Sequence, residues 1–159
     1  MEIVYQSIGT IHTTFQNIEG MPIQPGGAEG LRGRIEILPE FVPALKDLEG
    51  FSHLILIYHL HRAGEYKALV LPFLDKQPHG LFATRAPARP NPIGLSVVKL
   101  ISVHGNQIDI ENVDILDGTP LLDIKPYAPD FDAPEEVKVG WLMNSKGQLK
   151  QKRSDGRFR

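Results

Sequence analysis

The stretch LSVVKLISVHGNQIDIENVDI, residues 95–115, contains two strand-like runs separated by a single turn. Residues 95–104 and 107–115 are rich in Ile, Val and Leu, which favours strands in both runs. Gly105 and Asn106, which lie between the runs, suit the positive φ angles of a tight hairpin turn. The stretch therefore predicts two neighbouring antiparallel strands.

More strands are predicted on both sides of this hairpin, because thirteen prolines and fifteen glycines divide the chain into short apolar segments. These strands are expected at 3–12, 31–38, 53–61, 67–72 and 121–126. One short helix is expected near 40–48, where apolar residues recur at Phe41, Val42, Leu45 and Leu48. So many short strands and so little helix favour a mainly β fold, either an antiparallel barrel or a sandwich.

The composition is that of a soluble globular protein. The chain has 159 residues, enough for one domain with a hydrophobic core, and 42% of them are hydrophobic. No apolar run reaches the roughly 18 to 20 residues of a membrane-spanning helix. The start, MEIVYQ, lacks the basic region of a signal peptide, so we expect a cytoplasmic protein. Since the chain has no cysteine, disulfides and thiol chemistry are excluded.

Charge is distributed unevenly along the chain. The net charge is −2, yet residues 146–159 hold six basic side chains and one acid, a net charge of +5 that leaves −7 for the rest. The six are Lys146, Lys150, Lys152, Arg153, Arg157 and Arg159. We therefore expect a barrel domain at 1–142 and a basic tail at 143–159. Such a tail either binds a polyanion such as RNA or is a solvated terminus without a partner.

The segment FATRAPARPNPIG, residues 82–94, predicts a stiff loop that carries two arginines. Pro87, Pro90 and Pro92 lack an amide hydrogen and fix φ, so they exclude a central strand and order the loop in advance. Arg85 and Arg89 offer planar forks of donors for a carboxylate, a phosphate or a base edge. The alternative is an ordinary surface loop whose arginines pair with nearby acids.

Two other clusters carry titratable groups. Strand alternation over 121–127 puts Asp123, Lys125 and Tyr127 on one face together with Leu121, where they could shift one another's pKa and transfer protons. The same face could instead be the solvent side of an edge strand. His59 and His61 are expected on one face of the strand at 53–61, a pair that could bind a metal; no third ligand is evident, so hydrogen bonding is the preferred interpretation.

The glycines at 26, 27 and 30 match neither a dinucleotide-binding GxGxxG motif nor a Walker loop, and the chain has no GxSxG elbow. The sequence therefore excludes these nucleotide-binding and hydrolase motifs.

Four segments in chain order resemble the TrmO family, also called TsaA-like proteins. They are MPIQPG (21–26), LEGFSHLILIYHLHR (48–62), FATRAPARPNPIGLS (82–96) and VDILDGTPLLDIKPY (113–127). The resemblance covers about residues 5–130. It implies a small antiparallel β-barrel with few short helices that binds S-adenosylmethionine, unlike Rossmann-type methyltransferases, and forms a homodimer. The implied reaction is methylation of N6 of the threonylcarbamoyl-adenosine at position 37, in the anticodon loop of transfer RNA.

The resemblance also assigns site residues. The implied cofactor contacts are Pro22, Ile23, Gln24, His61, Arg62, Arg85, Leu95, Glu111, Asn112, Val113 and Asp114. The candidates on the substrate side are Arg89, Asn91 and Asp117, and the catalytic candidates are Asp123, Lys125 and Tyr127, with no metal. Some relatives carry an extra C-terminal domain, so the basic tail is the expected contact with transfer RNA here. Two alternatives are a module that binds S-adenosylmethionine or RNA without methylating it, and a metal-dependent barrel enzyme that uses His59 and His61.

Overall fold

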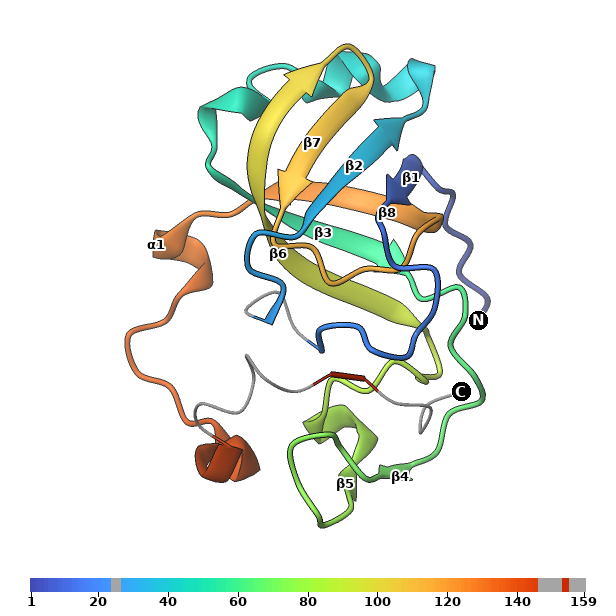
Figure 1. Cartoon of the computed structure of the whole chain (residues 1–159), viewed down its shortest axis with the longest axis vertical. Coiled ribbons are helices and arrows are strands. Elements are labelled where there is room, and N and C mark those ends of the chain that lie inside the picture. The colour runs from blue at the N-terminus through green and yellow to red at the C-terminus, as the bar shows by residue number, and fades with distance from the viewer. Residues whose placement is uncertain (24–26, 146–152, 155–159) are drawn as a thin grey trace.

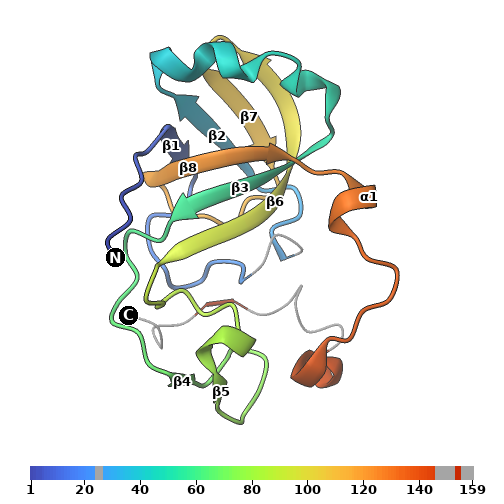
Figure 2. The same ribbon diagram turned by 180° about the vertical axis from the view of Figure 1, so that it is seen from behind.

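The computed structural model describes residues 1–23, 27–145 and 153–154, and its main feature is a closed antiparallel β-barrel. The strands follow one another around the barrel in the order β1 (Gly9–His12), β2 (Arg32–Ile37), β7 (Gln107–Glu111), β6 (Ile93–His104), β3 (His53–His59) and β8 (Thr119–Pro126). β8 pairs back with β1 and closes the ring. Figures 1 and 2 show the barrel from its two sides. The predicted mainly β antiparallel barrel is confirmed.

The hairpin predicted at 95–115 is present as β6 and β7. His104 pairs with Gln107, and Gly105 has a φ of 61°, the left-handed conformation that a tight turn needs. The Ile37 amide donates to the Asn106 carbonyl at 2.8 Å, which attaches the turn to the end of β2. β6 begins at Ile93, earlier than expected, and β7 ends at Glu111 because Asn112 adopts a φ of 64°.

Alternate residues of the strands fill the barrel interior. Leu54 and Leu56 on β3 and Val98 on β6 are fully buried, as are Ile108 and Ile110 on β7. Burial of one such side chain contributes about 1.5–3 kcal/mol, so this interior is the main source of stability. Tyr58 and Ser96 also point inward, at positions where their neighbours are aliphatic.

The helix predicted at 40–48 forms as two 3₁₀ segments, η2 (Pro39–Leu45) and η3 (Leu48–Gly50). Pro43 removes an amide donor inside the first segment, and Asp47 has a φ of 67° that separates the two. The apolar spacing is nonetheless used as predicted, because Phe41, Val42, Leu45 and Leu48 pack against the barrel core.

Several strand predictions were too long. The strand expected at 3–12 is only β1, because its pairing with β8 ends at Gly9 and Leu121. Next to this point β8 contains a bulge: Ile57 pairs with Asp123 and Tyr58 with Leu121, so Leu122 is an extra residue. The bulge reverses the alternation. Leu121 is fully buried, whereas Asp123 is on the outer face, so the predicted shared face of these two residues was wrong.

η2 and η3 lie at the top of Figure 1, and much of the remaining chain outside the barrel lies across the opposite end, in the lower half of the figure. The strand expected at 67–72 is the two-residue β4 (Leu69–Val70), which pairs with β5 (His79–Gly80) in a separate sheet. The short helices η4 (Leu81–Ala83), α1 (Pro129–Asp132) and η5 (Gly140–Ser145) complete the described elements. No helix in the described part of the chain is both long and apolar enough to cross a membrane.

Candidate functional site

A cavity of about 840 Å³ lies between the barrel and the segments that pack across its end. The barrel contributes Tyr58 of β3, Gly94 of β6 and Thr119 of β8, and the proline loop, residues 82–94, lies opposite. The volume is within the range of small-molecule sites. Most of the lining is apolar, and a few charged side chains, including Arg85 and Asp114, reach it.

The C-terminal part of the chain helps to enclose this cavity. Trp141 Nε1 donates to the Ala83 carbonyl at 2.8 Å, and the indole stacks on the His79 ring with a centroid distance of 4.5 Å. Ser154 bonds to three residues of the 18–22 segment: its amide donates to the Met21 carbonyl at 2.8 Å, its carbonyl accepts from the Gly20 amide, and its hydroxyl donates to the Ile18 carbonyl.

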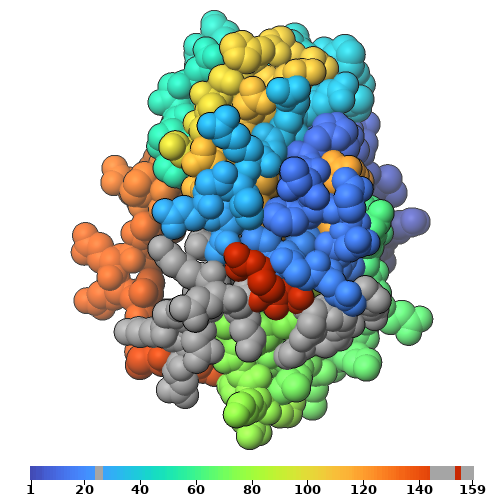
Figure 3. Space-filling view, in the orientation of Figure 1, coloured from blue at the N-terminus to red at the C-terminus, as the bar shows by residue number. Residues whose placement is uncertain are grey.

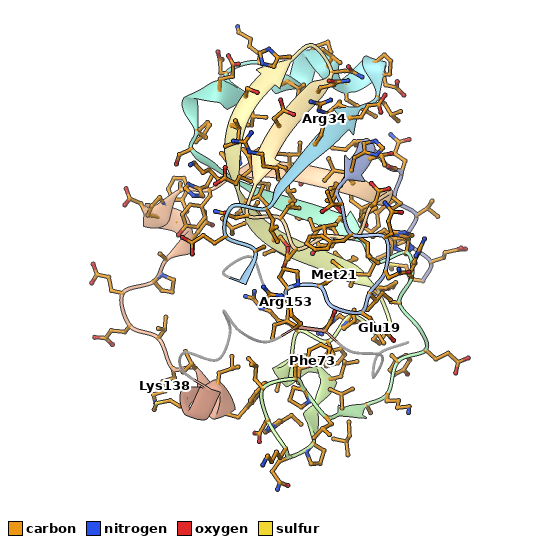
Figure 4. The ribbon with its side chains drawn as sticks, viewed as in Figure 1. Glu19, Met21, Arg34, Phe73, Lys138 and Arg153 are labelled. Carbon is orange, nitrogen blue, oxygen red and sulfur yellow. The ribbon has the colours of Figure 1, made fainter. Side chains whose placement is uncertain are left out.

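This pairing of distant segments can be followed in the figures. Figure 3 shows Arg153–Ser154 lying against the N-terminal segment on the surface, and Figure 4 shows Arg153 beside Met21. The domain boundary expected at 142/143 therefore falls within a region that lines the cavity on both of its sides, since Trp141, Leu142 and Ser154 all belong to the lining.

A chain of hydrogen bonds runs from the barrel interior to the cavity wall. The Tyr58 hydroxyl lies 2.9 Å from Ser96 Oγ, and Ser96 Oγ donates to Asp114 Oδ1 at 2.7 Å. Burial raises the pKa of the Asp114 carboxyl to about 6, although the Ser96 hydrogen bond and the Arg85 charge act in the opposite direction. Burial and the nearby Asp114 charge also raise the pKa of the Tyr58 hydroxyl. These three residues are called the Tyr58–Ser96–Asp114 relay below.

Gly94 allows the relay to form. A Cβ atom at this position would overlap the Tyr58 ring, so only glycine lets β6 approach the ring this closely. The family-like motif PNPIGLS therefore contains a residue whose role is packing against Tyr58.

The two arginines of the proline loop have different surroundings. Arg85 is exposed and lines the cavity. Arg89 also lines the cavity, but its NH1 donates to the Thr84 carbonyl at 3.0 Å and the Ala86 carbonyl at 3.2 Å, while its guanidinium lies 5.7 Å from the centre of the Phe82 ring. Arg89 thus stabilises the conformation of the proline loop, whether or not it also contacts a ligand.

Of the other implied cofactor contacts, Pro22, Ile23, His61, Arg62 and Leu95 line the same cavity. The pKa of the His61 ring is lowered, first by burial and then by the Arg62 and His59 charges. Thr119 Oγ1 donates to the Leu116 carbonyl and lies 3.4 Å from His61 Nδ1, so it can only accept from a protonated Nδ1. Neutral His61 then keeps Nε2 as an acceptor.

The remaining residues implied by the 111–114 motif have structural contacts. Asn112 Oδ1 accepts from the Gly30 amide at 2.9 Å, Val113 is fully buried in the barrel core, and Glu111 Oε2 lies 3.9 Å from Arg32 Nε. None of the three is part of the described cavity lining. Together they direct the chain so that Asp114 reaches the cavity.

The substrate-side candidates Asn91 and Asp117 lie away from the cavity. Asp117 accepts from the Thr13 amide at 3.0 Å and from Gln16 Nε2 at 3.2 Å, and mainly the first of these bonds lowers the pKa of its carboxyl. Asn91 lines a second cavity, of about 530 Å³, with His59 and the N-terminal segment. β3 ends at His59, so His59 and His61 do not share a strand face as predicted.

The catalytic candidates are on the outside of the barrel. Lys125 Nζ lies 2.8 Å from Asp123 Oδ2, and the Tyr127 ring meets His53 edge to face at 6.3 Å. None of the three belongs to the described lining of either cavity. Their catalytic role stays a prediction.

Some predictions lie outside the described residues. They are Gln24 and, in the basic tail, Lys146, Lys150, Lys152, Arg157 and Arg159. Within the described ranges, no group of three or more His, Asp or Glu side chains is placed to hold a metal ion.

Comparisons with known proteins place this barrel and cavity in a family. Residues 10–133 match the family described as the tRNA-methyltransferase O N-terminal domain. The chain belongs to the tRNA-methyltransferase O family. A crystal structure of TrmO from Pseudomonas aeruginosa superposes with a TM-score of 0.75 at 39% identity, over 89% of this chain and 63% of that one.

Relatives of this TrmO-family chain carry related names. A probable S-adenosyl-L-methionine-binding protein of Pyrococcus abyssi is 54% identical over 98% of this chain and 85% of its own length. The tRNA (adenine(37)-N6)-methyltransferase of Mus musculus is 38% identical over 86% of this chain, which spans only 33% of the mouse protein. The resemblance inferred from the four segments is confirmed.

Sequence reasoning missed Tyr58, Trp141 and Ser154 of the TrmO-family cavity, and Ser96, which bonds to two of the lining residues. Tyr58 and Ser96 were each visible as a polar residue at an inward position of an otherwise aliphatic strand, a signal that could have paired them. Trp141 and Ser154 lay in or near the segment expected to be a tail, and no local pattern links Ser154 to Met21 across the chain.

Proposed function

We propose that this chain is an S-adenosylmethionine-dependent methyltransferase that acts on N6 of adenosine 37 of transfer RNA, and that the acceptor is the threonylcarbamoyl form of that adenosine. The observation that supports this most is the cavity that brings Arg85 and Asp114 together beside apolar walls, in a chain of the tRNA-methyltransferase O family. The names of the mouse and Pseudomonas relatives support the same reaction class.

The cavity residues fit this cofactor by their chemistry. Arg85 offers paired donors for the cofactor carboxylate, and the Asp114 carboxylate suits a cationic group of the cofactor. Leu95 and Trp141 offer apolar surface for the adenine ring. The 840 Å³ volume is large enough for a ligand of this size.

When bound, S-adenosylmethionine supplies an electrophilic methyl group on a sulfonium. The residues of the chain then mainly provide alignment, since displacement requires the acceptor nitrogen in line at about 3–3.5 Å. The N6 lone pair is delocalised into the adenine ring, so a group that takes the N6 proton as the new bond forms assists the reaction. We assign this role to Asp123 or Tyr127, and the Lys125 charge would modify the proton affinity of whichever of the two accepts the proton.

Because Asp123 and Tyr127 lie outside the described cavity lining of their own chain, this assignment requires a second copy. We propose a cytoplasmic homodimer in which β8 of one copy faces the cavity of the other. At S-adenosylmethionine concentrations well below its Kd, Arg85→Ala and Asp123→Asn should each lose most of the activity, and a refolded equal mixture should regain about a quarter of it, because half of the dimers then contain one intact site. A mixture without recovered activity would contradict sites shared between copies.

The basic tail supports binding of the transfer RNA by charge. Replacing Lys146, Lys150, Lys152, Arg157 and Arg159 with Gln leaves Arg153 and Ser154 in place against the 18–22 segment, so the cavity wall is retained. The variant should bind transfer RNA more weakly, with a shallower salt dependence. Equal salt slopes for variant and wild type would assign RNA binding to another surface.

Mass spectrometry of nucleosides tests the reaction itself. Purified enzyme, labelled S-adenosylmethionine and transfer RNA that carries the threonylcarbamoyl group should yield the labelled N6-methyl product. The control is matched transfer RNA with unmodified adenosine 37. If only the control is labelled, the acceptor is unmodified adenosine 37 and not its threonylcarbamoyl form. If the cofactor binds and no label is transferred, the chain is a binding module.

A further inference from the structure

The function proposed above leaves Tyr58 and Ser96 without a role. Their hydroxyls occupy inward positions beside Leu54, Leu56 and Val98, where aliphatic side chains would pack without any need for hydrogen bonds. A buried hydroxyl costs free energy unless it is bonded, so this pair requires an explanation in terms of what it contacts. The contact is Asp114, at the cavity wall.

The hydrogen-bond direction in the relay follows from the number of protons. An ionised Asp114 only accepts, so Ser96 uses its single hydroxyl proton for Oδ1 at 2.7 Å. Ser96 can then only accept from Tyr58, whose hydroxyl lies 2.9 Å away and donates. The Tyr58 ring is 6% exposed and lies so close to Gly94 that a Cβ atom there would overlap it. The direction of both hydrogen bonds is therefore determined when Asp114 is ionised.

We propose that Tyr58 and Ser96 are positioning residues that keep Asp114 an oriented, ionised carboxylate for a cationic group of the cofactor. The inference rests on the function proposed above for the identity of that ligand. Other charged and titratable groups also act on this carboxylate or share its cavity: Arg85 from the proline loop favours ionisation, and His61 after β3 lines the same cavity.

Carbon-13 NMR of labelled aspartate carboxyl groups tests the relay in the full chain without ligand, with Asp114→Asn identifying the signal. Ser96→Ala should raise the pKa of Asp114 by roughly one unit, because it removes a hydrogen bond to the charged form. Tyr58→Phe should produce a smaller rise, and Ser96→Thr, which retains the hydroxyl, should restore the wild-type value. Unchanged values in both Ser96→Ala and Tyr58→Phe would overturn the relay.

Ser102→Ala is the matched control. Ser102 lies on β6, as Ser96 does, and donates to Asp109 Oδ2 of β7 at 3.2 Å. Neither Ser102 nor Asp109 belongs to the described cavity lining. This variant should leave the pKa of Asp114 unchanged. A rise equal to that of Ser96→Ala would show a general effect of disturbing the hairpin and would contradict the proposal.

Calorimetry of S-adenosylmethionine binding between pH 5 and 8 links the relay to the ligand. Wild-type affinity should fall as Asp114 is protonated, and the midpoint of that fall should move to higher pH in Ser96→Ala. Affinities that do not depend on pH would overturn the role of the carboxylate. A wild-type protein that binds no cofactor at any pH, yet shows the NMR shifts, would refute the proposed function and not the relay.

Discussion

Asp114 and Asp123 both belong to the barrel's sequence motifs, and their surroundings differ in almost every physical respect. Asp114 faces the cavity, and burial raises the pKa of its carboxyl to about 6 even though the buried Ser96 hydroxyl donates a hydrogen bond to it. Asp123 is 45% exposed on the outer face and pairs with Lys125, whose pKa is raised by that hydrogen bond and by the opposite charge. Both partners of the outer pair keep their contact with water.

The comparison shows which of the two carboxylates lowers the free energy of unfolding. A carboxylate held away from water by neutral partners disfavours its own ionised form and destabilises the folded protein at neutral pH. An exposed ion pair is screened by solvent and contributes little in either direction. The cavity wall at Asp114 therefore lowers the stability of the folded protein at neutral pH, and the outer face of β8 within this one chain is an ordinary surface.

The largest effect is expected for Asp114→Asn. A pKa raised from 3.8 to about 6 costs the folded state about 3 kcal/mol at pH 7, since each pKa unit corresponds to about 1.4 kcal/mol. The folded protein binds this proton more tightly, so stability is lost as pH rises from about 4 to about 6. Urea denaturation should show the variant to be more stable at pH 7 by up to about 3 kcal/mol and no different at pH 3.5. Equal gains at both pH values would contradict the burial argument.

Gly94→Ala should produce the next largest effect, with the opposite sign. The added methyl overlaps the Tyr58 ring, and overpacking of this kind costs about 1–3 kcal/mol of unfolding free energy. Gly50→Ala is the control, because a Cβ there meets open space. If both variants unfold at the same urea concentration, the close packing of β6 on Tyr58 is not important for stability.

Arg85→Ala should weaken ligand binding. The loss of a charge-assisted hydrogen bond should weaken S-adenosylmethionine by about tenfold, measured by calorimetry. Arg89→Ala is the contrasting variant: it removes the bonds to the Thr84 and Ala86 carbonyls and should lower the melting temperature as well. Unchanged affinity in Arg85→Ala would remove this side chain from the cofactor site.

The smallest effect is expected on the outer face. Lys125→Gln removes the ion pair with Asp123 and should leave the midpoint of urea denaturation unchanged within error, because both side chains are exposed. It should also leave cofactor affinity unchanged. A large loss of stability would show that a second copy buries this ion pair, whereas the proposed shared site must leave it open to the substrate.

The barrel could be predicted because its determinants are local. Alternation and the Gly105–Asn106 turn define β6 and β7 within a few residues of each other, and the apolar spacing of the 40–48 segment was correct even though Pro43 and Asp47 divide it into two 3₁₀ turns. The bulge at Leu122 was not predicted, because one extra residue leaves the composition of a strand unchanged.

The site was less predictable, because its parts come together from distant places in the chain. Met21 and Ser154 are 133 residues apart, and no periodicity connects them. Family resemblance supplied Arg85 and Asp114, which line the cavity, and also Glu111, Asn112 and Val113, whose side chains serve the turn and the core. Resemblance identifies a motif, but only the packing of the folded chain distinguishes the residues that line the cavity from the neighbouring residues that position them.

Closure of the barrel by β8 and β1 also limits how this protein can associate. Each barrel strand has a neighbour on both sides over at least part of its length, so a partner can add a strand only along short stretches such as residues 122–126 of β8, which do not pair with β1. Elsewhere on the barrel a partner, including a second copy, must be recognised by side chains on the outer face. Specificity of assembly is thus open to change by single substitutions that leave the fold intact.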